Sequence, residues 1–374
     1  MVSIISLVTL LVMVGCTVFC YFKGTLYKSF LMIITAVLAS TVAFGYFELL
    51  AGLLLGRGID SAIASWSYLI GYLLLFVIAF AVFQALLEKL ADKGVQLGLY
   101  PERIGRPVCG LVLGLIVAGS LINAAAMAPI SGVPYKRFEG ASVQPDRLSK
   151  PFLSAEDFTA GWASILSKGC FSKGKSMAVF HPDFVTEQFI NKVGAASDVS
   201  TLSSPGVLQI PPKNAVWRLP ENITETGGRA LSGESGKSFY VVRAGLRKNA
   251  ELVSPFTFSQ LRVVCKKENA AANPLSGKGI NTYPYGYIKT RNSLERVDSL
   301  GETLNIEQSV SQGPVKQIDL VYQIPRGYIP VLFAFKKNVV SQLPQPVDFE
   351  KVGQLEPYSG TVVVGSDEPA EGEE

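Results

Sequence analysis

The sequence VSIISLVTLLVMVGCTVFCYF, at residues 2–22, contains no Asp, Glu, Lys or Arg. Three further apolar runs follow at residues 30–49, 61–87 and 107–130, and Glu48 is the one charged residue within the four runs. A helix of about 20 residues crosses the ~30 Å hydrocarbon core of a bilayer, and lipid requires that the backbone polar groups be satisfied inside the segment. Residues 1–130 therefore predict a domain of four transmembrane helices, the first of which is retained rather than cleaved as a signal peptide.

The remainder of the 374-residue chain has a different composition. Charged residues are scarce before Lys136 and frequent after it, which predicts a second, water-soluble region. The formal net charge of +4 does not favour a nucleic-acid surface. His181 is the only histidine, and no CxxC pair occurs among the five cysteines, so we expect no metal or other cofactor.

The basic residues between the spans predict an orientation, because Lys and Arg accumulate in the cytoplasmic loops of membrane proteins. The joints after the first and third spans contain Lys23, Lys28, Lys89, Lys93, Arg103 and Arg106. The opposite side contains Arg57, Lys136 and Arg137. This excess predicts a multi-pass protein of the inner membrane in which both termini, and hence the C-terminal domain, are extracytoplasmic.

Two features of the spans are candidates for function. Gly110 and Gly114 have the four-residue spacing that lets helix backbones approach closely in lipid. The spacing favours packing within one bundle, with a homo-oligomeric seam or a pore as the alternative. Glu48 is an intramembrane carboxylate, but it stands about 30 Å of helix beyond Lys28. This position favours a role at the outer interface over a place on the path of a small channel or transporter.

The first 130 residues also resemble a known family. The resemblance depends on the Lys23-Gly24 pair, on the joint that runs from Glu88-Lys89-Leu90 to Glu102-Arg103-Ile104-Gly105, and on the glycine spacing of the fourth span at Gly110, Gly114 and Gly119. These features resemble the colicin V production protein (CvpA) family over about a third of the chain. Pro107 and a wider spacing between Gly105 and Gly110 depart from the family pattern. The resemblance implies an inner-membrane protein associated with toxin export and envelope upkeep, without catalytic residues.

Residues 131–153 are rich in Pro, Gly and polar side chains and predict a linker. A helix is predicted from Ser154, as N-cap, to Gly169. Its apolar face consists of Phe158, Trp162, Ile165 and Leu166. A second helix is predicted from Pro182 to Gly194. Residues 154–237 are therefore predicted to be helical and then irregular.

From residue 238 to residue 345 the apolar period changes to two. Alternating runs occur at residues 240–246, 261–265, 318–324 and 331–335. Such runs, separated by turns, predict a mainly antiparallel β-sandwich within an α+β region. The spacing of these runs weakly resembles that of the Ig-like modules of bacterial envelope proteins. Residues 346–374 predict an acidic, disordered tail.

Two catalytic motifs are imitated in this region. Residues 233–238, GESGKS, resemble the end of a phosphate-binding loop, but Leu231 stands where that loop needs a glycine and a predicted strand follows. His181, Asp198 and Ser235 occur in the order of a serine-protease triad, and a membrane-anchored protease family combines four spans with such a domain. The short, turn-rich separation of these three residues favours a non-enzymatic protein, and His181 is predicted to cap the helix at Pro182.

Cys170 and Cys265 are predicted either to form a disulfide in an oxidising space or to be two separately buried thiols. The sequence thus predicts a membrane anchor or scaffold for export or envelope assembly, which contacts lipid and an unidentified protein partner. The alternatives are a small channel that uses Glu48 and, less favoured, a membrane-anchored serine protease.

Overall fold

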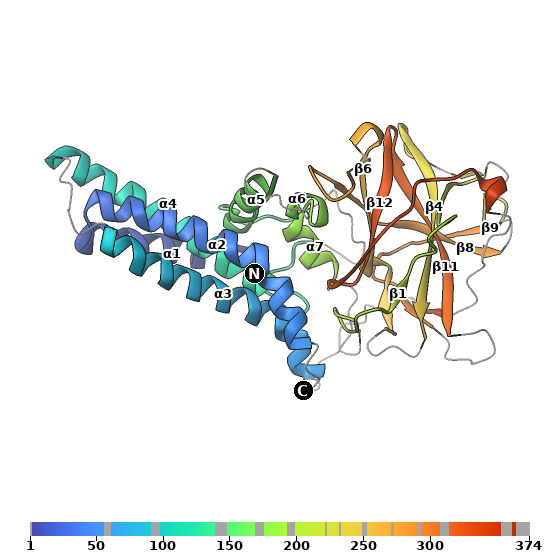
Figure 1. Cartoon of the computed structure of the whole chain (residues 1–374), viewed down its shortest axis with the longest axis horizontal. Helices are drawn as coiled ribbons and strands as arrows, with labels where there is room; N and C mark the ends of the chain where they lie inside the picture. Colours follow the sequence, from blue (N-terminus) through green and yellow to red (C-terminus); the bar gives the residue numbers. More distant parts are fainter. Residues whose placement is uncertain are drawn as a thin grey trace. The chain divides into compact units, whose positions relative to one another are not determined.

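The computed structural model describes residues 2–55, 61–90, 98–138, 148–168, 176–192, 199–220, 223–231, 233–248, 253–270, 273–290, 293–306, 314–352 and 361–363. The chain divides into two compact units (Figure 1). The helical unit comprises Met1–Arg137, Leu148–Lys173 and Phe184–Phe189. The β unit comprises Phe138–Arg147, Gly174–Asp183 and Ile190–Glu374.

The predicted fold class is confirmed for both units. Four long apolar helices open the chain: α1 (Val2–Lys23), α2 (Leu26–Leu55), α3 (Ser61–Leu90) and α4 (Leu99–Met127). Each contains a stretch long and apolar enough to cross a membrane. α4 begins eight residues before the predicted span and continues through Pro107 without a break. Proline is tolerated inside membrane helices because neighbouring groups satisfy the freed carbonyl.

The described parts of the two predicted cytoplasmic joints contact each other at Glu102. The Glu102 carboxylate accepts a hydrogen bond of 2.9 Å from the backbone N–H of Leu26, at the first residue of α2. A carboxylate is stabilised there because the N-terminus of a helix carries unsatisfied N–H donors and a partial positive charge. Arg106, one turn further along α4, forms an ion pair with Glu102. The pair therefore fastens the start of α4 to the start of α2.

Shorter helices follow the spans: α5 (Ala155–Lys168), α6 (Met177–Phe180) and α7 (Phe184–Ile190). α5 matches the helix predicted after Ser154. The second predicted helix is shorter than expected, and His181 lies at the C-terminal end of α6 rather than at the start of the next helix. Of the predicted apolar face of α5, Phe158, Trp162 and Ile165 are exposed and Leu166 is half-buried. The buried residues of the helix are Ala155, Glu156, Thr159, Ala160 and Ala163.

The strands that the structure describes in the β unit form three sheets. The largest sheet has the order β1-β4-β11-β8-β9-β3, with β2 also paired to β4. Its strands are β1 (Leu208–Gln209), β2 (Val216–Arg218), β3 (Thr224–Glu225), β4 (Lys237–Arg247), β8 (Pro284–Thr290), β9 (Ser293–Arg296) and β11 (Val315–Pro325). The second sheet, ordered β13-β12-β6-β7, contains β6 (Leu261–Lys267), β7 (Ile280–Thr282), β12 (Tyr328–Phe335) and β13 (Val339–Gln342). The third contains β5 (Phe256–Thr257), β10 (Thr303–Asn305) and β14 (Thr361–Val363).

One apolar core joins the two larger sheets. Alternate residues of β4, such as Val242 and Leu246, share this core with Leu320 of β11. Val263 of β6 and Phe333 of β12 belong to it as well. Val241, which points to the other side of β4, packs in a second cluster. β4 is therefore buried on both faces, as a central strand of a layered domain should be.

Residues 195–237, predicted to be irregular, contribute β1, β2 and β3. The predicted disordered tail lies largely outside the described residues, although β14 falls within it.

Candidate functional site

Glu48 lies on an exposed part of α2, so its carboxylate is not enclosed in the core of the helical unit. Gly110 and Gly114 lie against α1. A Cβ atom added to Gly110 would overlap the Cα atom of Thr17, and one added to Gly114 would overlap the Cα atom of Met13. The two glycines therefore let the backbones of α1 and α4 touch within one chain.

Cys265 is a free cysteine, buried in β6, with its sulfur 3.6 Å from Oγ1 of Thr282. Burial raises the pKa of its thiol to about 12. Cys170 lies outside the described residues, so the disulfide stays a prediction.

The three residues that imitate a protease triad have unlike surroundings. His181 is buried at the end of α6, and Ser235 is exposed in the turn before β4. Asp198 lies outside the described residues. Residues 233–236 lead into β4 rather than into a helix, as expected for a turn and not for a phosphate-binding loop.

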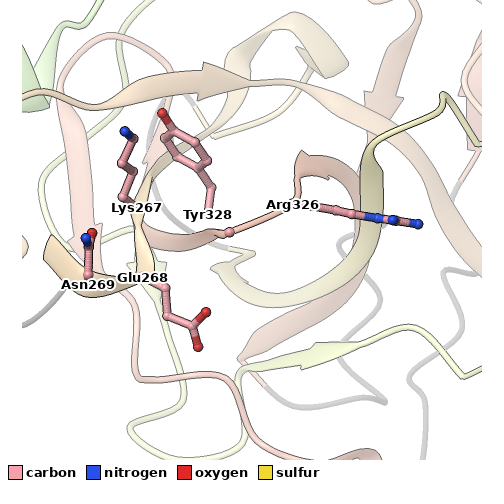
Figure 2. A pocket seen from close by; sticks show the side chains of 6 residues that line it. Lys267, Glu268, Asn269, Arg326 and Tyr328 are labelled. Atoms are coloured by element: carbon pink, nitrogen blue, oxygen red, sulfur yellow. The ribbon is translucent and has the colours of Figure 1, made fainter.

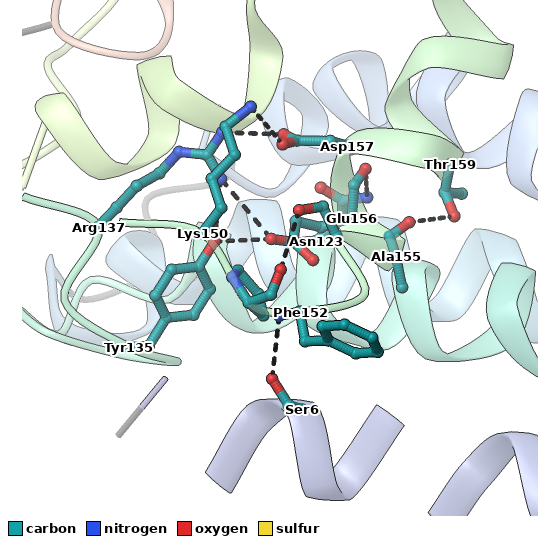
Figure 3. A network of polar contacts seen from close by, with 12 residues as sticks. Ser6, Asn123, Tyr135, Arg137, Lys150, Phe152, Ala155, Glu156, Asp157 and Thr159 are labelled. Atoms are coloured by element: carbon teal, nitrogen blue, oxygen red, sulfur yellow. Dashed lines mark hydrogen bonds and ion pairs between the residues drawn. The ribbon is translucent and has the colours of Figure 1, made fainter. Parts of the chain in front are cut away.

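The helical unit contains a polar cluster that connects α4, α5 and the segment predicted to be a linker (Figure 3). We call it the Arg137 cluster, and its members are Asn123, Tyr135, Arg137, Lys150, Glu156 and Asp157. Arg137 is 1 % exposed and Glu156 is 0 % exposed. Charges buried to this degree are costly unless they are paired and hydrogen-bonded.

The Arg137 guanidinium donates hydrogen bonds of 2.9 Å to the Tyr135 hydroxyl and of 2.9 Å to the Asp157 carboxylate. The Tyr135 hydroxyl in turn donates to Oε1 of Glu156 at 2.6 Å. The Lys150 ammonium lies 3.0 Å from Asp157. Burial raises the pKa of Glu156, although the hydrogen bond from Tyr135 acts in the opposite direction.

Two cations and two carboxylates balance within the cluster. Nδ2 of Asn123 also donates to the backbone carbonyl of Glu156 at 3.1 Å, which fixes the first turn of α5 against α4. Because Glu156 is wholly buried and its Oε1 and backbone carbonyl accept hydrogen bonds from Tyr135 and Asn123, the cluster is suited to hold α5 in place. No local sequence pattern indicated this cluster, because Tyr135 and Arg137 lie in a stretch whose composition predicts a linker.

The β unit contains a groove beside the turn between β11 and β12 (Figure 2). Its volume is about 530 Å³, and it is lined by Lys267, Glu268, Asn269, Arg326, Gly327 and Tyr328. A second hollow of about 280 Å³ shares Glu268 and Arg326 and adds Arg218 and Tyr240. We call the two together the Arg326 groove. Its three cations, Arg218, Lys267 and Arg326, outnumber its one carboxylate, Glu268.

The side chains of the Arg326 groove are spread out. Lys267 and Tyr328 are opposed in the register of β6 and β12 and lie side by side, whereas Arg326 points away from them (Figure 2). Arg218 lies over the ring of Tyr240, 5.8 Å from its centre, and donates a hydrogen bond of 3.3 Å to its hydroxyl. Cations dispersed in this way suit an extended anionic surface better than one small ion.

Among the residues that the structure describes, no group of three or more His, Cys, Asp or Glu side chains is placed to hold a metal ion. The fold and these sites define the class: a multi-pass membrane protein that carries a separate, antiparallel β domain. Comparisons with protein-family models, with curated proteins and with solved structures found no match.

Proposed function

We propose that the chain is a multi-pass protein of the bacterial inner membrane that holds its β unit on the extracytoplasmic side. There it acts without chemistry of its own, as an anchor and scaffold that binds a protein partner during export or envelope assembly. The observation that carries this proposal is the cationic Arg326 groove on a β domain that four spans attach to the membrane. Fixed positive charges favour and steer the association of an acidic protein surface.

The orientation is supported by the distribution of cations. Arg137 is one of the three basic residues on the predicted extracytoplasmic side, but it is buried in ion pairs with Glu156 and Asp157. An arginine that is neutralised inside the fold adds little to the loop charge that orients the spans. On the cytoplasmic side Arg106 is likewise paired, with Glu102, so the excess of cytoplasmic cations is the same when both arginines are left out. The association with export follows from the resemblance of the spans to the CvpA family.

Cysteine labelling of the full chain in intact cells tests the location. Ser235→Cys, in the exposed turn before β4, should react with a membrane-impermeant maleimide when the native cysteines have been replaced. Tyr100→Cys, which is exposed at the start of α4, should react only after the membrane is permeabilised. The reverse pattern would place the β unit in the cytoplasm and overturn the proposal.

Photocrosslinking tests the binding role. A crosslinker that replaces Tyr328 should form an adduct with a protein in cells, and Arg326→Glu should abolish that adduct because it reverses one of the three cations that line the groove. Lys289→Glu is the matched control, since Lys289 is an exposed cation of the same unit outside the Arg326 groove. Loss of the adduct in both variants, or in neither, would contradict recognition by the groove.

A further inference from the structure

α5 has an unusual distribution of side chains for a helix outside the four spans. Its exposed residues are Phe158, Trp162, Ile165 and Lys168. Trp162 is 43 % exposed and Ile165 is 60 % exposed, and Phe152, just before the helix, is 91 % exposed. A helix on a water-covered surface normally buries such side chains and exposes polar ones. The opposite arrangement in α5 requires an apolar partner.

The contacts of α5 place it alongside the spans rather than beyond their ends. A Cβ atom added to Gly119 of α4 would overlap the backbone of Ala155 and the side chain of Thr159. Gly119 lies eight residues before the last residue of α4, which corresponds to about 12 Å of helix. Just before α5, the backbone N–H of Phe152 donates a hydrogen bond of 3.2 Å to Oγ of Ser6, which lies within the apolar sequence of α1. Both contacts therefore lie within membrane-spanning sequence.

Exposed apolar side chains also lie on α4, which α5 contacts, and on α1, which Phe152 contacts. On α1, Ile4 and Leu7 lie within two residues of Ser6 and are 58 % and 57 % exposed. On α4, Leu121 follows shortly after Gly119 and is 46 % exposed. Side chains of this kind on membrane helices face lipid. The Phe158, Trp162 and Ile165 side chains give α5 an exposed apolar face of the same kind.

The polar side of α5 is compatible with such a position. Oε1 of Glu156 receives the hydrogen bond of Tyr135, and Asp157 pairs with Arg137 and Lys150, so both carboxylates of the first turn have partners within the protein. Aromatic residues concentrate where acyl chains meet headgroups, because their rings are apolar and tolerate a partly wet boundary. Lys168 at the end of α5 suits a lipid phosphate.

We propose that α5 is an interfacial membrane helix, and that the bilayer covers its Phe158–Trp162–Ile165 face together with Phe152. The helical unit would then contact lipid through a fifth element, which lies in the outer boundary of the membrane without crossing it. The Arg137 cluster acts as the clamp that holds this helix against α4.

Photocrosslinking of the full chain in native membranes tests the proposal. A benzophenone amino acid that replaces Trp162 should form adducts with phospholipid, detected by mass spectrometry of the purified protein. Val77, which is 59 % exposed on α3, is the positive control, and Ser235, exposed in the β unit, is the negative control. A lipid-adduct yield nearer to that of Val77 supports the proposal, and a yield nearer to that of Ser235 overturns it.

The same experiment distinguishes the other occupants of this face. An adduct of position 162 with a second copy of the chain, or with another protein in place of lipid, would assign the face to a protein interface and overturn the proposal. Ile165 provides a second probe position one turn along, so a misfolded Trp162 variant does not decide the result. Correct folding is checked by the elution of each variant as a single species in detergent.

Discussion

Arg243 on β4 and Asp319 on β11 stand directly opposite each other in the antiparallel register and form a two-point ion pair. Nε of Arg243 lies 2.7 Å from Oδ1 of Asp319, and the terminal nitrogen lies 2.8 Å from Oδ2. Asp319 is 0 % exposed, and the guanidinium also lies over the ring of Trp217, 5.1 Å from its centre. The pair therefore joins the two longest strands at the centre of the large sheet.

We expect Asp319→Ala to destabilise the β unit by about 3–5 kcal/mol, because it leaves a largely buried guanidinium without its carboxylate. Hydrogen exchange of the β4 and β11 amides in the full chain measures this loss. Lys289→Ala is the matched control. It breaks a 2.7 Å pair with Glu295 at the surface, where an ion pair contributes at most about 1 kcal/mol. Equal effects of the two substitutions would contradict a special role for the buried pair.

Buried lysines of the β unit predict that its stability depends on pH. Burial lowers the pKa of Lys192 and of Lys336 to about 7 each, from a usual value of 10.5. Burial also lowers the pKa of the neighbouring Lys337. The unfolded chain therefore binds more protons than the folded chain between pH 7 and 10.5, and the free energy of unfolding should rise with pH across that window.

The slope contributed by each such lysine approaches about 1.4 kcal/mol per pH unit. Urea unfolding of the full chain in detergent at pH 7 and at pH 9 measures the difference. Lys336→Met should remove one lysine's share of the slope, whereas Lys289→Met, at an exposed position, should leave the slope unchanged. A slope in the Lys336 variant equal to that of the unsubstituted chain would show that Lys336 does not titrate in this range.

The close approach of α1 and α4 gives a prediction for the helical unit. We expect Gly114→Leu to cost about 1–3 kcal/mol, because the added atoms must displace the α1 backbone at Met13. Gly45→Ala is the control, since an added Cβ there meets nothing within 4 Å, and Ala favours the helix over Gly by about 1 kcal/mol. Thermal unfolding followed by the reaction of buried Cys20 with a fluorescent thiol probe should show opposite shifts for the two variants. A Gly114→Leu variant with unchanged thermal stability would mean that α1 and α4 pack less closely.

Much of the architecture could be predicted because the signals were long. Each span is an apolar run of twenty residues or more, and β4, β6, β11 and β12 alternate over several residues. β1 and β3 contain only two residues each, so periodicity has nothing to detect in them. These strands form because β1 pairs with β4 and β3 pairs with β9. Each partner strand lies in a distant part of the sequence.

The candidate sites could be predicted from the sequence only in part. Periodicity located the apolar face of α5, but it does not state what covers that face, and the structure shows it exposed. Tyr135 and Arg137 stand among residues that predict a linker, and their partners Glu156 and Asp157 follow about twenty residues later. A pairing at that distance leaves no local pattern, so only the folded chain shows it.

The Arg137 cluster gives a final prediction, on the docking of α5. Arg137→Leu removes the cation that both Glu156 and Asp157 contact, and Glu156 has no exposed surface through which water could replace it. We expect this substitution to cost about 3–5 kcal/mol in the packing of α5, as for other buried ion pairs that lose one partner. Faster hydrogen exchange along α5 in the full chain measures the effect.

Lys136→Leu is the matched control, because Lys136 is the neighbouring residue and is exposed. It removes the same charge from the same segment without touching the cluster, so exchange along α5 should be unchanged. The double substitution Arg137→Leu with Glu156→Leu should recover part of the loss, since two apolar side chains in contact no longer leave a buried charge unpaired. A double variant with the full sum of the two single losses would show that Arg137 and Glu156 act independently, and that the cluster does not hold α5 as one unit.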